Sequence, residues 1–139
     1  VIRTNIYGFN SSSGNSLFEW AFKNFKSKNK ITGYSDIYFN AIYTKQLVKA
    51  VKKILDNDHN GVINVAGDYS VSKFDFLKLI CEIFDFDKSL LLEGESPSNN
   101  SIKRSKNITL DITEIKEKYD ICPKLIEGLI QLKRDLEIK

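Results

Sequence analysis

The sequence has 139 residues and a formal net charge of +3, with 42% of its residues hydrophobic and 28% charged. These values are ordinary for one globular domain with a buried core, and the small excess of basic residues argues against a nucleic-acid-binding protein. A single histidine and two cysteines without C-x-x-C spacing argue against a structural metal site. No segment approaches the roughly 20 apolar residues of a membrane span, so we expect no membrane partner and a cytoplasmic location.

The first half of the chain alternates between strand and helix patterns. β-Branched and apolar residues over 1–7 predict a strand that ends at Gly8. The spacing Ser16-x-x-Glu19 predicts a capping box that opens a helix over 16–27. After it we expect a short strand over 31–33, an extended segment over 36–42 and a strongly amphipathic helix over 43–56.

The second half continues the alternation. Residues 62–65 predict a strand, and Ser72-x-x-Asp75 predicts the start of another helix. The later elements expected are a short strand over 90–92, a polar loop over 93–107, an extended segment over 108–110, a short helix over 111–119 and a last helix over 123–136 that begins at Pro123. The order of elements predicts an α/β or an α+β protein, and we expect the α/β class.

Helix 16–27 is rich in aromatic residues. Phe18, Phe22 and Phe25 recur at helical spacing, which favours a core or an interface over a ligand-stacking platform. Trp20 falls on another side of the helix, so its role stays open. The lysines that follow, at positions 23, 26, 28 and 30, are typical of a solvated face, with phosphate binding as the alternative.

One turn resembles half of a calcium loop. Asp56-x-Asp58-x-Asn60-Gly61 matches the first ligands of an EF-hand, but the twelfth position, which needs a bidentate carboxylate, is Gly67. We therefore predict a solvated helix-to-strand turn that contains His59.

Five segments, taken in chain order, resemble motifs of the extended short-chain dehydrogenase/reductase family, in its dTDP-4-dehydrorhamnose reductase branch. They are RTNIYG at 3–8, YFNAIYT at 38–44, GVINVAG at 61–67, SKFDF at 72–76 and RSKNITLD at 104–111. Within the last segment, Ser105 stands where the family pattern has proline.

The resemblance implies a Rossmann domain for NAD(P) and a smaller sugar-nucleotide lobe. It assigns residues 1–14 and 43–67 to the Rossmann side, and residues 15–42 and 68–139 to the lobe. The sequence has no G-x-x-G-x-x-G loop, so we expect the NAD(P)-binding part to lie outside this chain. The strand pattern is already under way at the first residue, and we expect the chain to be a piece of a longer protein.

The resemblance also implies binding residues. Asn5, Tyr7, Arg104 and Lys106 would contact the nucleotide sugar, and Thr4 and Asn5 would lie beside the cofactor. Arg104 would reach the diphosphate, since a guanidinium suits phosphate oxygens. The alternatives are a loop-turn residue for Asn5 and a surface charge for Arg104.

No catalytic residue is expected in this chain. Tyr69-x-x-x-Lys73 has the spacing of the family's catalytic pair, but it straddles the helix start predicted at Ser72, so the two side chains would not share a helical face.

The resemblance favours the substrate-binding part of an NAD(P)-dependent nucleotide-sugar reductase of polysaccharide biosynthesis. An epimerase or dehydratase, and a non-catalytic binding or regulatory protein, are the alternatives. We expect these residues alone to be inactive and to self-associate, and the full-length protein to be an enzyme and a candidate homodimer.

Overall fold

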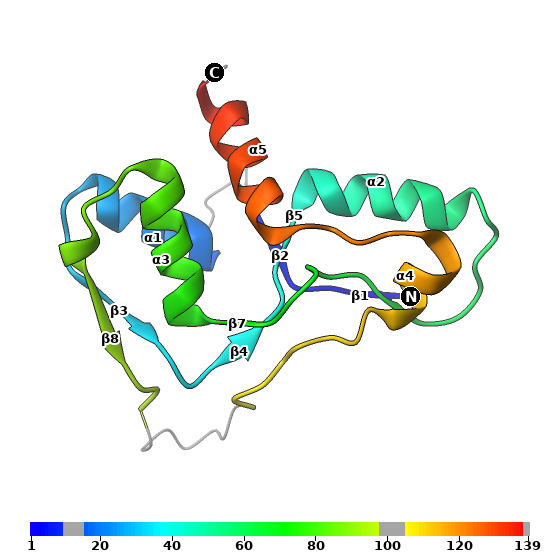
Figure 1. Cartoon of the computed structure of the whole chain (residues 1–139), viewed down its shortest axis with the longest axis horizontal. Coiled ribbons are helices and arrows are strands. Elements are labelled where there is room, and N and C mark those ends of the chain that lie inside the picture. The colour runs from blue at the N-terminus through cyan, green and yellow to red at the C-terminus, as the bar shows by residue number, and fades with distance from the viewer. Residues whose placement is uncertain (10–15, 98–104, 138–139) are drawn as a thin grey trace. The chain divides into compact units, whose positions relative to one another are not determined.

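The computed structural model describes residues 1–9, 16–97 and 105–137 of the chain. It confirms the α/β class and divides the chain into two compact units (Figure 1). The first unit comprises Val1–Gly8, Asn40–Ser70 and Thr109–Lys139, and the second comprises Phe9–Phe39 and Val71–Ile108.

In its described residues the first unit contains two short parallel strand pairs and three helices. Strand β1 (Ile2–Arg3) pairs with β6 (Ile63–Asn64), and β2 (Ile6–Tyr7) pairs with β5 (Ile42–Tyr43). Its helices are α2 (Thr44–Leu55), α4 (Thr113–Tyr119) and α5 (Leu125–Glu137). The strand predicted over 1–7 is therefore observed as two short strands in one extended segment.

An apolar core in the first unit joins α2, α4 and β6. Helix α2 contributes Ala50 and Ile54, β6 contributes Ile63, and α4 contributes Ile115 and Tyr119. Ala50 and Ile54 lie four residues apart, on one face of α2. The helix predicted over 43–56 is thus confirmed within one residue at each end.

Asn40 joins separate segments of the first unit. It is only 2% exposed, and its Nδ2 donates to the carbonyl oxygens of Gly67 (3.1 Å) and Leu110 (2.9 Å). Its Oδ1 accepts from the Leu110 amide at 2.9 Å. A side chain at Gly67 would collide with the carbonyl oxygen of Ala41, so only glycine fits this approach of two backbone segments.

The start of α5 is fixed by a distant carboxylate. The Leu125 amide donates to Asp68 Oδ1 at 3.0 Å, and the Asp68 amide donates to the Pro123 carbonyl at 2.9 Å. The helix therefore begins at Leu125, and the prediction that Pro123 is its first residue was wrong. Asp68 lies 57 residues away, so local sequence could not reveal this cap.

The second unit contains a parallel and an antiparallel strand pair. Strand β3 (Ile31–Tyr34) pairs in parallel with β8 (Leu91–Gly94), and β4 (Tyr38–Phe39) pairs antiparallel with β7 (Val71–Ser72). Its helices are α1 (Leu17–Lys26), α3 (Lys73–Phe84) and the 3-10 turn η1 (Lys88–Leu90).

Both helix starts predicted in this unit are confirmed. Ser16 and Glu19 form the capping box of α1, and Ser72 Oγ accepts from the Asp75 amide at 2.9 Å at the start of α3. Phe18 and Phe25 of α1 are buried, as predicted for the aromatic face of this helix.

The two units do not coincide with the division predicted from sequence. Residues 109–139 pack with the first unit, because Ile112, Ile115 and Ile121 are buried in the core that contains Ile63. The prediction had grouped residues 68–139 with 15–42. Which unit lies on the cofactor side, and which on the sugar side, stays a prediction.

Candidate functional site

The second unit has a cavity of about 330 Å³ between α1, β3 and α3. Its walls come from all three elements: Leu17 and Trp20 from α1, Thr32, Gly33 and Tyr34 from β3, and Lys73 and Leu77 from α3. Every lining residue lies within the one unit.

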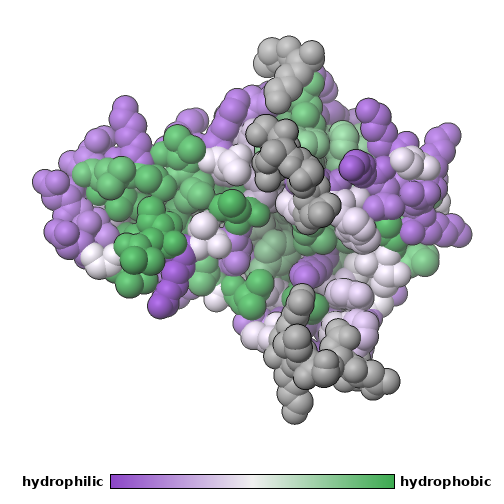
Figure 2. All heavy atoms as spheres, turned by 180° about the vertical axis from the view of Figure 1, so that it is seen from behind, coloured by the Kyte–Doolittle hydropathy of each residue, from purple (hydrophilic) through white to green (hydrophobic). Residues whose placement is uncertain are grey.

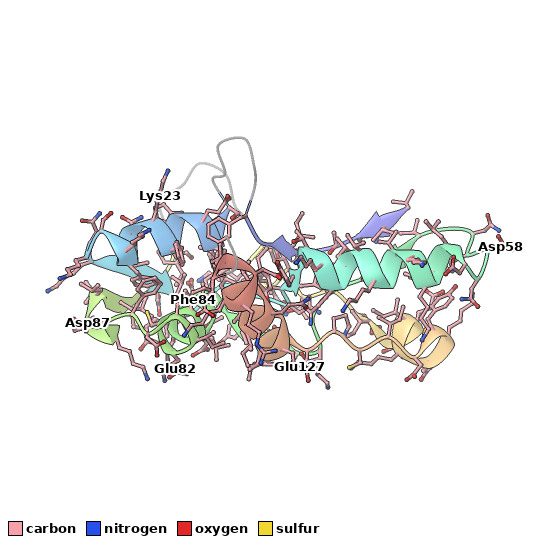
Figure 3. The ribbon with its side chains drawn as sticks, turned by 90° about the horizontal axis from the view of Figure 1, so that it is seen from above. Lys23, Asp58, Glu82, Phe84, Asp87 and Glu127 are labelled. Atoms are coloured by element: carbon pink, nitrogen blue, oxygen red, sulfur yellow. The ribbon has the colours of Figure 1, made fainter. Side chains whose placement is uncertain are left out.

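The cavity follows from how α1 packs. Phe18, Ala21 and Phe25 point into the core, whereas Trp20 is 43% exposed and faces the cavity. Lys23, on the same helix, projects outward into solvent (Figure 3). One helix therefore provides a core face, a cavity wall and a solvated face, which is why Trp20 departs from the aromatic stripe.

A glycine brings the strand close to α3. A Cβ at Gly33 would lie 2.9 Å from the Cα of Phe74 and 3.2 Å from a methyl of Leu77. The missing side chain lets β3 lie against α3, and Gly33 and Leu77 both line the cavity. Sequence reasoning did not assign Gly33 a role.

The lining has the chemistry of a site for a flat, anionic ligand. Trp20 and Tyr34 offer aromatic surface for a planar ring, and Thr32 offers a hydroxyl. Lys73 is the first residue of α3, where its ammonium adds to the positive end of the helix dipole. An aromatic ring that carries a phosphate group fits this combination.

The site residues predicted from sequence fall in both units. Thr4, Asn5 and Tyr7 lie in the first and Lys106 in the second, while Arg104 lies outside the described residues. None of them lines the cavity described above.

Tyr7 is part of the packing of the first unit. Its side chain is 4% exposed, and its hydroxyl donates to the Leu125 carbonyl at 3.2 Å. Burial raises the pKa of Tyr7 far above its ordinary range, since a phenolate would lose its hydration. These contacts anchor α5, and its substrate-binding role stays a prediction.

Thr4 and Asn5 are the residues predicted to lie beside the cofactor. The Thr4 hydroxyl is buried and has no hydrogen-bond partner among the described residues, and Asn5 Nδ2 donates to Asn40 Oδ1 at 3.4 Å. Solvent does not reach the Thr4 hydroxyl in this arrangement, and the sequence supplies no glycine-rich phosphate loop. The residues present do not fit NAD(P) by themselves, so we derive no chemical step through it.

Lys106 is held by an aspartate. Its Nζ lies 2.8 Å from Asp36 Oδ2, and Asp36 also accepts from the Ser96 amide (2.9 Å) and the Ser96 hydroxyl (2.7 Å). The hydrogen bond from Lys106, followed by those from Ser96, holds the pKa of Asp36 well below its usual range. The same bond raises the pKa of Lys106. Sequence reasoning did not identify Asp36.

The pair Tyr69 and Lys73 is separated by the start of a helix, as predicted. Tyr69 lies before the Ser72 cap and is 41% exposed, and Lys73 is the first residue of α3. The other candidate, the turn around Asp58, is an exposed connection between α2 and β6 (Figure 3). Within the described ranges, no group of three or more possible metal ligands gathers there or elsewhere.

A larger hollow lies in the first unit. It measures about 610 Å³ and is lined by Lys49, Glu127, Ile130, Gln131, Arg134 and Asp135, from α2 and α5. Its walls mix positive and negative surface side chains and contain no aromatic ring, so it matches a nucleotide less well than the smaller cavity does. No described helix is long and apolar enough to cross a membrane.

The comparisons with known proteins agree on the fold. The chain is similar to the crystal structure of dTDP-4-dehydrorhamnose reductase from Bacillus anthracis in complex with NADP, with a TM-score of 0.82 and 19% identity over 96% of this chain. The dTDP-4-dehydrorhamnose reductase from Clostridium acetobutylicum gives a TM-score of 0.83 and 19% identity over 98% of the chain. The UDP-glucose 4-epimerase from Thermotoga maritima, solved with UDP-glucose, gives 0.72 and 20% over 98%.

The chain spans about half of each of these structures, covering 47%, 48% and 46% of their lengths. No family model and no curated protein sequence matches it. The class defined by the fold is therefore α/β, with the fold that these reductases and the epimerase have in the part that the chain covers. The particular fold predicted from the five motifs, that of a dTDP-4-dehydrorhamnose reductase, is confirmed.

Proposed function

We propose that this chain is the sugar-nucleotide-binding part of an NAD(P)-dependent oxidoreductase that resembles dTDP-4-dehydrorhamnose reductase. The observation that carries the proposal is the likeness of nearly the whole chain, 96%, to a reductase solved with NADP. The order of the five sequence motifs supports the same function independently. We place the intact protein in the cytoplasm and in polysaccharide biosynthesis.

The cavity of the second unit would bind the nucleotide end of the substrate. The base would stack on Trp20 or Tyr34, and the Thr32 hydroxyl would hydrogen-bond to a ring edge or to the ribose. Lys73 would neutralise part of the diphosphate charge. All the groups that this binding mode needs are present in one unit.

The residues predicted from sequence remain proposed contacts of the intact protein, apart from this cavity. In the proposal, Lys106 contacts the nucleotide sugar with the two Nζ protons that its bond to Asp36 leaves over. Arg104 reaches the diphosphate, and Asn5 and Tyr7 lie toward the sugar. Thr4 and Asn5 lie beside a cofactor bound mainly by residues outside this chain.

Measuring NAD(P)H consumption tests the reaction type. The intact protein would be mixed with a 4-keto-6-deoxy nucleotide sugar and NADPH or NADH, and the absorbance of the reduced cofactor followed. A reductase consumes one cofactor per sugar reduced, and we expect that result. Absence of turnover with any nucleoside-diphosphate keto-sugar would overturn the reductase proposal.

The second candidate is an epimerase or dehydratase, which the likeness to the UDP-glucose 4-epimerase favours. Such an enzyme regenerates its cofactor, so the sugar would change without net loss of NAD(P)H. Analysis of the sugar products in the same reaction mixture distinguishes the two reactions.

A further inference from the structure

A further cavity of the first unit lies between α2 and the segment that leads into α5. One wall is α2, with Lys49 and Lys53, and the other is formed by residues 120–124 and α5, with Glu127 near the start of that helix (Figure 3). All of its lining residues belong to this one unit. Its volume of about 310 Å³ is at the lower end of the usual range for ligand sites, roughly 300–1,000 Å³, so it suits a small molecule.

The two flanks of α2 differ in chemistry. Val48 and Leu55, seven residues apart on one flank, are both 67% exposed. Figure 2 shows hydrophobic surface gathered over the part of the first unit formed by α2, β1 and β6. Lys49 and Lys53, four residues apart, lie on the other flank and line the cavity. Helix α2 contains no acidic residue, so nothing within the helix neutralises these two neighbouring charges.

Four charged side chains of the cavity have no ion pair among the described residues. Lys49 and Lys53 line it from α2, and Asp120 and Glu127 line it from the other wall. No salt bridge within the described ranges includes any of the four. Opposite charges therefore line one cavity without meeting, and a ligand that carries both signs of charge can bridge them.

The remaining surface of the cavity is apolar or already paired. Ala50 and Ile121 are 3% and 8% exposed and belong to the core of the unit. Lys124 Nζ lies 3.3 Å from Asp68 Oδ2, so its charge is balanced locally. A few separated polar groups over apolar surface are typical of a small-molecule site.

We propose that this cavity binds an acidic α-amino acid, a small molecule with two carboxylates and one ammonium group. The two carboxylates accept from Lys49 and Lys53, and the ammonium donates to Glu127 and Asp120, because charge-assisted hydrogen bonds are the strongest available here. This binding does not depend on the reaction proposed above, since the cavity shares no residue with the nucleotide cavity of the second unit.

Three matched ligands test the charge pattern by calorimetric titration of the intact protein. L-Glutamate carries all three charges, glutarate lacks the ammonium, and 4-aminobutyrate lacks one carboxylate. We expect glutamate to bind about tenfold or more tightly than either analogue, because each analogue loses charge-assisted contacts. No binding of glutamate, or an affinity for either analogue equal to that for glutamate, would overturn the proposal.

Substitutions on the two walls separate their roles. Lys53→Gln should weaken binding of glutamate about tenfold, because one carboxylate loses its partner. Glu127→Gln should weaken binding of glutamate but not of glutarate, which has no ammonium. The matched control is Lys52→Gln, which removes an exposed lysine of the same helix that does not line the cavity. Equal losses for Lys53→Gln and Lys52→Gln would contradict the proposed contacts.

Alkylation of Cys122 shows where the ligand binds. Its thiol is exposed and lines the cavity, whereas Cys81 of the second unit is 1% exposed and serves as the control for unfolding. Glutamate at about ten times its Kd should slow the reaction of Cys122 with neutral iodoacetamide roughly tenfold, since only the empty site reacts. Mass spectrometry of the two cysteine peptides measures both rates. A Cys122 rate that saturating glutamate leaves unchanged would place the ligand elsewhere and overturn the proposal.

Discussion

Replacing Asn40 by alanine should destabilise the protein strongly. The substitution removes both donors to Gly67 and Leu110 and the acceptor of the Leu110 amide, in a site that is 2% exposed. Three backbone groups, one buried and two partly buried, then lose their partners. Each such loss costs about 1–3 kcal/mol, and we expect a total near 3–5 kcal/mol because water can enter part of the space. Against a typical total of about 5–15 kcal/mol, this is a large fraction.

Urea unfolding of the intact protein measures the loss. The midpoint should fall while the slope stays unchanged, since the surface exposed on unfolding is the same. Asn57→Ala is the control, because the Asn57 side chain donates to the Lys53 carbonyl on the exposed surface. Asn40→Asp should also destabilise at neutral pH and recover partly on acidification, when the carboxyl regains a proton to donate. A loss below about 1 kcal/mol for Asn40→Ala would refute the account of Asn40 as the joining residue.

Three further predictions follow from the second unit. Gly33→Ala should cost about 1–3 kcal/mol, as overpacking does, because its new methyl would meet the Phe74 backbone; a melting temperature equal to that of the parent protein would contradict the close approach. Asp36→Asn should make the free energy of unfolding depend less on pH under acidic conditions. The pKa of Asp36 is lowered in the folded state, so its stabilisation is present above about pH 4 and is lost as pH falls toward the folded pKa. Urea midpoints measured between neutral pH and pH 2 should converge for the two proteins at the acid end, and parallel curves would refute the role of this carboxylate. Lys73→Gln should weaken binding of a nucleoside diphosphate about tenfold while leaving the free nucleoside unchanged, because only the charged ligand meets the ammonium; calorimetry that shows equal losses for both ligands would remove Lys73 from the phosphate site.

Much of the fold was predictable because its signals are local. The Ser16–Glu19 and Ser72–Asp75 patterns gave both helix starts of the second unit, since a cap is decided within one turn of helix. The apolar spacing of α2 predicted where this helix begins and ends. The five motifs predicted the fold, which the solved structures confirm.

What sequence reasoning missed depends on contacts between distant segments. The cap of α5 comes from Asp68, and the joining role of Asn40 involves Leu110, 70 residues away. Asn40 did leave a signal, since it is a polar residue inside the apolar run YFNAIY. The packing of 109–139 with the first unit had no such signal, because the residues buried there, Ile112 and Ile115, would suit either core.

The candidate site was predicted less well than the fold. Trp20 stood apart from the aromatic stripe in the sequence, but only the structure shows that it faces a cavity with Tyr34 and Lys73. The contacts of Tyr7 and Lys106, to Leu125 and Asp36, are also long-range pairs that no motif reports. A motif identifies the segment, whereas the direction of each side chain is set by tertiary packing.

Calorimetric titration of the intact protein with dTDP and UDP tests the central claim, that the cavity of the second unit binds the nucleotide of a nucleotide sugar. Trp20→Ala is the informative variant, Trp20→Phe keeps an aromatic ring, and Tyr69→Ala removes an exposed aromatic residue outside the cavity. We predict binding to the parent protein, a loss of about tenfold or more for Trp20→Ala, as expected for a lost stacking partner, and little change for the other two. Equal affinity of the parent protein and Trp20→Ala for the nucleotide would contradict the account.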